Sequence, residues 1–160
     1  MAAFDYFLKI DGIQGESTDA KHKDEIEVLS WSWGETQERA PSFSGGGGIG
    51  KVAMTDLHVS ASISKASPQL LLACASGKHV KSAVLTGRRA GKAQADFLTF
   101  SLSDVLVSGY QTGGATADAP LDSISLSFSK IEVSYQAQTA KGTLAPPVRA
   151  GWDVKANKAF

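Results

Sequence analysis

The chain has 160 residues, and its 16 basic side chains balance its 16 acidic ones, so its charge does not indicate nucleic acid or a membrane surface as a partner. This length predicts one domain, residues 1–160, that buries about 68–70% of its unfolded surface and needs no cross-link to fold. The single cysteine, Cys74, excludes an internal disulfide framework.

The N-terminal segment predicts a strand and not a targeting sequence. Apolar and other side chains alternate along residues 4–10, which is typical of a strand with one buried face. Charges at Asp5 and Lys9 leave no apolar run of the 7–15 residues that a signal peptide has. No later stretch approaches the ~20 apolar residues of a membrane span. We therefore expect a cytoplasmic protein that, if it is exported, leaves without a signal peptide and without inserting in a membrane.

The next predicted strand contains two tryptophans, Trp31 and Trp33, which share the phase of Leu29. Ile26 and Val28 have the opposite phase, so the apolar side of the strand changes near Val28. A β-bulge at that point, or burial on both faces, would produce this change. The tryptophans could stack a sugar or a base if exposed, but core or subunit contact is the favoured interpretation.

The segment "SFSGGGGIGK", residues 42–51, matches two nucleotide-binding patterns, G-x-x-x-x-G-K and G-x-G-x-x-G. A phosphate loop needs a helix after it and a Ser or Thr after Lys51, where this chain has Val52. Residues 52–64 alternate with a period of two and predict a strand instead. We interpret residues 37–51 as a long loop between two strands, with no nucleotide or other cofactor.

One short helix is predicted after this strand. Ser67 is a suitable N-cap, Pro68 suits the first helical position, and Gly77 suits the C-terminus. The predicted apolar stripe consists of Leu70, Leu71 and Cys74. A helix of this length must dock on a sheet to be stable.

Further strands are predicted over residues 80–88, 96–110, 122–138 and 151–157. In the second of these, one face is expected to carry Leu98, Phe100, Leu102 and Leu106. The apolar phase of residues 122–138 switches after Phe128, which predicts a bulge or a strand with two packing environments. About seven strands and one helix make this a mainly β domain, a barrel or two packed sheets.

The sequence contains no recognisable catalytic or metal-binding constellation. The three histidines, His22, His58 and His79, lack the spacing of metal ligands, and Cys74 lies on the apolar side of the helix. No nucleophile motif of the form G-x-S-x-G is present. We therefore expect neither enzymatic activity nor a metal site.

Serine is unusually frequent on the polar sides of the predicted strands. Ser30 and Ser32 lie opposite the tryptophans, and alternating serines continue along residues 60–64 and 123–129. Such a face has little charge and little side-chain entropy to lose on contact. It is either a plain low-charge surface or a smooth surface against which other polypeptides lie.

Six segments together resemble the haemolysin-coregulated protein (Hcp) family, the tube subunit of type VI secretion. They are "FLKIDGIQGES" (7–17), "EVLSWSWG" (27–34), "GGGGIGKV" (45–52), "SPQLLLACASGKH" (67–79), "VLVSGYQTGG" (105–114) and "GWDVKANK" (151–158). The resemblance implies a compact β-barrel flanked by a helix, and hexameric rings that stack into a hollow tube. It also implies export of the tube by a contractile sheath behind a spike protein, with effector proteins in the lumen.

The resemblance implies roles for two groups of residues. Ser30 and Ser32 are expected on the channel wall, where effectors pass. The glycine loop is expected to contact the neighbouring subunit or ring through Phe43, Gly45, Gly46, Gly47, Gly48 and Ile49. The alternative is a monomeric β-barrel that binds a small ligand or carbohydrate, with Trp31 and Trp33 at its mouth. A hydrolase that uses scattered carboxylates is a third interpretation without support in the sequence.

Overall fold

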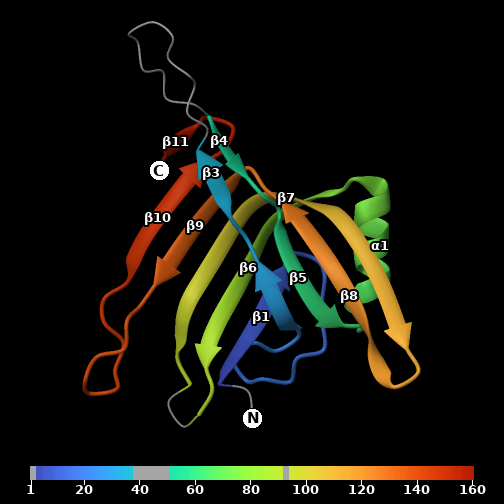
Figure 1. Ribbon diagram of the computed structural model, residues 1–160, viewed down its shortest axis with the longest axis horizontal. Coiled ribbons are helices and arrows are strands. Elements are labelled where there is room, and N and C mark those ends of the chain that lie inside the picture. The colour runs from blue at the N-terminus through green and yellow to red at the C-terminus, as the bar shows by residue number, and fades with distance from the viewer. Residues whose placement is uncertain (1–2, 38–50, 92–93) are drawn as a thin grey trace, which may run out of the picture.

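The structure is a computed structural model that describes residues 3–37, 51–91 and 94–160 (Figure 1). These residues form a mainly β domain with one helix, which confirms the expected fold class with more strands than anticipated. In chain order the elements are β1 (Phe4–Ile10), β2 (Ile26–Ser32), β3 (Glu35–Gln37), β4 (Val52–Met54), β5 (Leu57–Ser62), α1 (Ala66–Ser76), β6 (His79–Arg89), β7 (Asp96–Ala115), β8 (Asp118–Ser127), β9 (Lys130–Tyr135), β10 (Val148–Asp153) and β11 (Lys158–Ala159).

Nine of the strands form one antiparallel sheet in the order β11-β10-β9-β7-β6-β1-β2-β5-β8. Because β8 also pairs with β7, six strands (β7, β6, β1, β2, β5 and β8) close into a barrel. Closure satisfies the edges of these six strands, which an open sheet would leave exposed. Strands β9, β10 and β11 continue the sheet from β7 beyond the barrel wall (Figure 1).

Strand β7 can serve both parts of the sheet because it is long and bends at Asp104. Its first half pairs with β9, its second half pairs with β8, and Asp104 has a φ of 52°. The bend changes which side of the strand faces the core: Phe100 and Leu102 are buried before it, and Val105 and Val107 after it. The prediction that Leu106 shares the face of Leu102 is therefore wrong.

The predicted strand over 122–138 is two strands. Strand β8 ends at Ser127 and β9 begins at Lys130, so the change of apolar phase after Phe128 marks a break between them. Each strand keeps a regular alternation, with Ile124 and Leu126 buried in β8 and Ile131 buried in β9. The change of apolar phase is confirmed, but it lies between two strands and not within one.

The predicted β-bulge in β2 is confirmed. The pairing of β2 with β5 shifts register between Val28 and Ser30, so that Leu29 is the extra residue. Val28 is buried and Leu29 is 59% exposed. Leu29 therefore does not share the face of Trp31, contrary to the sequence pattern. Trp31 is half-buried and packs on the core, with ring centroids 5.7 Å from Tyr6 and 5.1 Å from Phe100.

Residues 52–64 also form two strands and not one. The break lies at Thr55, which forms two hydrogen bonds with Gly34. The Thr55 N–H donates to the Gly34 carbonyl at 2.9 Å, and the Gly34 N–H donates to Thr55 Oγ1 at 3.0 Å. Strand β5 then joins the barrel, whereas β4 pairs with β3 in a separate two-stranded ribbon. Residues 111–121 form the end of the β7–β8 hairpin. The predicted final strand over 151–157 corresponds to the end of β10 and a turn.

Helix α1 docks on the barrel through a different face than predicted. Leu70 is 1% exposed and Ala73 is buried, but Leu71 is 56% exposed. The N-cap is Lys65, without a side-chain hydrogen bond, and Gly77 ends the helix in the left-handed conformation as expected. Ser67, the predicted cap, lies inside the helix and is buried.

The glycine loop lies almost entirely outside the described residues, including Phe43, Gly45, Gly46, Gly47, Gly48 and Ile49. Its contact with a neighbouring subunit or ring therefore stays a prediction. Lys51 is exposed and is followed by β4, a strand. This confirms the expectation that no helix N-terminus follows the glycines.

Candidate functional site

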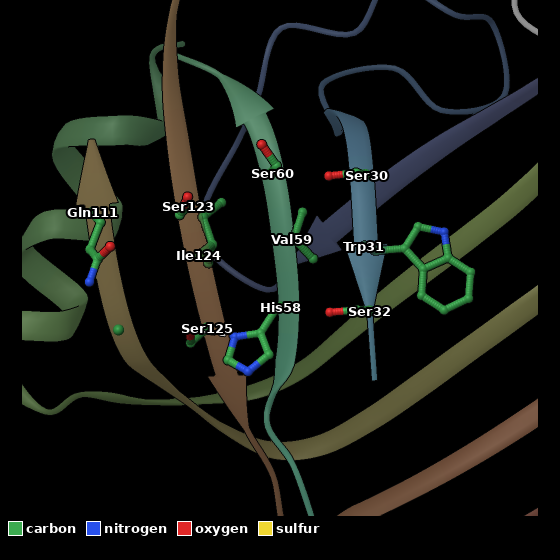
Figure 2. A pocket seen from close by; sticks show the side chains of 11 residues that line it. Ser30, Trp31, Ser32, His58, Val59, Ser60, Gln111, Ser123, Ile124 and Ser125 are labelled. Carbon is green, nitrogen blue, oxygen red and sulfur yellow. Dashed lines mark hydrogen bonds between the residues drawn. The ribbon is translucent and has the colours of Figure 1, made fainter. Parts of the chain in front are cut away.

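The predicted serines meet in a shallow depression on the outer side of the barrel, where β2, β5, β8 and β7 lie side by side. Its volume is about 480 Å³. We define the serine face as the polar residues that line it: Ser30, Ser32, His58, Ser60, Gln111, Ser123 and Ser125. Figure 2 shows Ser30 and Ser32 on one side of β2 and Trp31 on the other. The prediction that these serines lie opposite the tryptophan is confirmed.

Strand register arranges the serine face in two rows that cross four strands. One row runs through Ser30, Ser60, Ser123 and Gln111. The other runs through Ser32, His58, Ser125 and Gly109. The bulge at Leu29 sets this arrangement, because it turns Ser30 and Ser32 outward and Trp31 inward. A shift of one residue would exchange the two sides.

The second row is closely packed at Gly109. A Cβ atom at this position would lie 3.2 Å from the Cβ and Oγ of Ser125, tighter than an ordinary contact. In the same row, His58 Nδ1 lies 2.9 Å from Ser125 Oγ. The absence of a side chain at Gly109 therefore leaves room for Ser125 on the neighbouring strand, and no side chain of β7 projects from the surface at this point.

The serine face carries mostly small, neutral polar groups. Its two rows carry hydroxyl and amide groups, and His58 is the one ionisable side chain in them. Small neutral side chains lose little conformational entropy when another surface contacts them. Among the described residues, no group of His, Cys, Asp and Glu could hold a metal ion.

A second polar cluster holds the loop between β1 and β2. His22 is 6% exposed and stacks on Phe7 with ring centroids 4.4 Å apart. Its Nδ1 lies 2.9 Å from Glu25 Oε2 and its Nε2 lies 3.0 Å from Asp96 Oδ1. Burial alone would lower the pKa of His22, but the hydrogen bonds to Asp96 and Glu25 outweigh burial and raise that pKa above its ordinary value.

Arg88 completes this cluster. Its side chain is 4% exposed, its guanidinium donates to Asp19 at 2.7 Å, and its Cζ lies 4.9 Å from the Phe7 ring centroid. The hydrogen bond from Arg88 lowers the pKa of Asp19 to about 2. Sequence reasoning missed this cluster because Asp19, His22, Arg88 and Asp96 are far apart in the chain.

The fold agrees with what comparisons with known proteins find. A family model described as "Type VI secretion system effector, Hcp" matches residues 7–135. The chain belongs to the Hcp family. Protein hcp1 of Pseudomonas aeruginosa is 43% identical to it over 158 residues, covering 97% of this chain and 98% of that protein.

Two solved Hcp-like structures share the whole fold. Hcp1 of Salmonella typhimurium is 37% identical, with a TM-score of 0.80, and the alignment covers 99% of this chain and all of that one. A structure described as a type six secretion system protein is 32% identical, with a TM-score of 0.92 over 99% of this chain and all of that one.

The Hcp family is not a family of enzymes. None of the helices among the described residues has the length and apolarity to span a bilayer.

Proposed function

We propose that this Hcp is the subunit of a type VI inner tube. Six copies form a ring, rings stack into a hollow tube, and the tube is itself secreted after assembly in the cytoplasm. Support for this proposal comes from family membership over nearly the whole chain, at 43% identity to Protein hcp1. The partners are other copies of the chain, effector proteins in the lumen, a spike protein at the tip and a contractile sheath outside.

The observation that carries the proposal is the serine face. A tube that conducts effectors needs a wall that many sequences can touch without adhering. The two rows of the serine face offer hydroxyl groups on three adjacent strands, β2, β5 and β8, and the amide of Gln111 on the fourth, β7. We therefore place Ser30 and Ser32 on the lumen wall, with their row partners Ser60 and Ser123 beside them.

The glycine loop has the second role in the proposal. Phe43 and Ile49 are its large apolar residues, and ordering its glycines loses backbone entropy of ~1–2 kcal/mol per residue. Contact with a neighbouring subunit or ring is the means we propose for offsetting that loss. Lys51 binds no phosphate in this account, and the subunit has no catalytic role and no cofactor.

The test replaces one serine of the wall with a larger polar side chain. Effectors are co-expressed with the wild type, with Ser32→Gln and with Ser103→Gln, a control at an exposed serine of β7 outside the serine face. We expect intact rings from all three and loss of effector from Ser32→Gln alone, because glutamine fills part of the depression. Equal effector recovery with intact Ser32→Gln rings would place the lumen wall elsewhere.

A further inference from the structure

His58 is the one side chain of the serine face that can carry a charge. It lies on β5, and Figure 2 shows it between Ser125 of β8 and Ser32 of β2. Its side chain is exposed, so a molecule in the depression can reach it. The imidazole group of histidine ordinarily changes its charge between about pH 5 and 8. The charge of an otherwise neutral surface therefore depends on this residue.

A hydrogen bond fixes the orientation of the His58 ring. Its Nδ1 lies 2.9 Å from Ser125 Oγ, and these two residues are direct neighbours in the register of β5 and β8. Ser125 is the one hydrogen-bond partner of the ring among the described residues. In a protonated imidazole both nitrogens are donors. The Nδ1–H group then donates to Ser125, and the Nε2–H group is left for an acceptor that enters the depression.

The other two histidines have carboxylate partners that His58 lacks. His22 has a carboxylate oxygen within 3.0 Å of each ring nitrogen, and His79 Nδ1 lies 2.9 Å from Asp104 Oδ1. His58 forms no ion pair with a carboxylate in the part of the chain that the structure describes. A protonated His58 therefore has no counter-ion from its own chain and attracts an anion from outside.

The carboxylates nearest along the neighbouring strands do not supply this counter-ion. Asp56 lies two positions before His58, and its Oδ2 accepts a hydrogen bond from Ser108 Oγ of β7 at 2.5 Å. Asp122 of β8 is buried, and its two oxygens accept hydrogen bonds from other hydroxyl groups. The residues of β2, β7 and β8 that line the depression carry no ionisable group.

The polar groups around His58 suit a carboxylate better than other groups. Ser32 is its neighbour in the row on β2, and Ser60 lines the same depression two positions along β5. Hydroxyl groups and a protonated imidazole all donate hydrogen bonds, and each oxygen of a carboxylate accepts them. Hydrogen bonds between charged groups are roughly twice as strong as those between neutral ones. A polypeptide supplies such carboxylates as Asp and Glu side chains.

We propose that His58 sets the charge preference of the lumen wall, because its protonated form binds carboxylates of the cargo. The wall then retains polypeptides with an acidic surface at low pH and releases them as pH rises. This inference rests on the proposed function, which places the serine face in the lumen, and it names the class of cargo. One exposed ion pair contributes little, but every copy in a ring presents the same His58, so an acidic cargo meets several of them at once.

The test measures the binding of short peptides to purified wild-type rings. Three probes are used, in which Ser alternates with Glu, Gln or Lys, each with the same neutral fluorophore. Fluorescence anisotropy at low salt, where charges are little screened, gives the affinity at about pH 6 and about pH 8. Glu side chains are ionised at both values, because they ordinarily titrate near ~4.3. We expect the Glu peptide to bind about five- to twentyfold more weakly at the higher pH. The Gln peptide should show no change, and the Lys peptide should bind most weakly.

Three variants assign this pH dependence to His58. His58→Gln keeps a polar side chain without a charge, so the Glu peptide should bind weakly at both pH values. His58→Lys keeps a positive charge throughout, so it should bind tightly at both. His79→Gln is the matched control, because it removes an exposed histidine outside the serine face and should keep the wild-type pH dependence. Native mass spectrometry and thermal melts verify rings and fold in each sample, and His58→Ser replaces His58→Gln if that variant does not assemble.

The outcomes separate this inference from the proposed function. With intact wild-type rings, equal affinity of the Glu peptide at the two pH values would overturn the role of His58. A pH dependence that His58→Gln keeps, or that His79→Gln loses, would overturn it as well. All of these results would leave the proposed function standing. A wild type that forms no rings would contradict the proposed function itself.

Discussion

The hydroxyl of Ser67 in α1 donates a hydrogen bond to the carboxylate of Asp122 in β8, which is 2% exposed. The hydroxyl of Tyr110 in β7 donates to the other oxygen of the same carboxylate at 2.9 Å. One buried carboxylate thus connects the helix to two barrel strands. A buried carboxylate is tolerated because each of its oxygens accepts a hydrogen bond.

We expect Asp122→Ala to destabilise the fold by about 2–4 kcal/mol, because it leaves the hydroxyl donors of the buried Ser67 and the partly buried Tyr110 unpaired. Urea unfolding of the monomer measures this loss. Asp118→Ala, at an exposed position of the same strand, is the control and should change little. Equal losses in the two variants would show that the buried carboxylate does not hold α1.

Leu70 and Leu71 are adjacent but should respond very differently to truncation. Leu70→Ala removes a fully buried side chain and should cost ~2–5 kcal/mol. Leu71→Ala should change the stability of the monomer by about 0.5 kcal/mol or less, since its side chain is mostly exposed. Denaturant midpoints are measured at a concentration where the chain is monomeric. A large loss from Leu71→Ala would mean that α1 docks through its predicted stripe after all.

His22 should make stability depend on pH in one direction. Its pKa is raised in the folded state, so its contribution is fully present below the ordinary histidine pKa of ~6.5 and is lost as pH rises through the raised value. We expect the difference in unfolding free energy between wild type and His22→Gln to shrink as pH rises from about 6 to about 9. A difference that grows over this range would contradict the ion pairs with Glu25 and Asp96.

Asp19 should act in the opposite direction and at lower pH. Its pKa is lowered to about 2 by Arg88, so its contribution is present above the ordinary aspartate pKa of ~3.9 and is lost as pH falls toward 2. Asp19→Asn should therefore destabilise the protein at neutral pH and match the wild type in strong acid. Acid titrations of both proteins, followed by circular dichroism, measure this. A constant difference down to pH ~2 would exclude the ion pair as the cause.

Shortening residues 38–50 to a tight turn tests the proposed bridging loop. If the loop joins subunits or rings, the shortened chain should keep its circular-dichroism spectrum and most of its melting temperature, because the barrel strands and α1 already form a continuous core. Stacking should be abolished and secretion should stop. Electron microscopy of the shortened chain shows whether tubes form, and a thermal melt of the same sample shows whether the fold is retained. Normal tubes would contradict the bridging role, and a collapsed fold would assign the loop to the core.

Local pattern predicted a large part of the fold. Alternation located β1 and β6, and the change of phase at Val28 located the bulge that turns Ser30 and Ser32 outward. The alternation of serines suggested a smooth serine surface, because a period of two fixes which side chains lie on the same side of a strand. Local signals also predicted one helix and either a barrel or two packed sheets, and the resemblance to the Hcp family favoured the barrel.

Features that depend on contacts between residues far apart in the chain could not be predicted from the sequence. Nothing in the sequence shows that Asp104 adopts a positive φ, which reverses the phase of β7. Three consecutive leucines, 70–72, leave the buried side of α1 undetermined until the barrel surface is known. The two rows of the serine face require the pairing of four strands, and the ion pair of His22 with Asp96 joins residues 74 positions apart.

The central claim, that this Hcp is a tube subunit, is tested most directly by native mass spectrometry of the purified wild-type chain with negative-stain electron microscopy of the same sample. The account predicts a species with the mass of six chains and ring-shaped particles with a central hole, some of them stacked. A monomeric mass at every concentration, with no rings in the images, would contradict it.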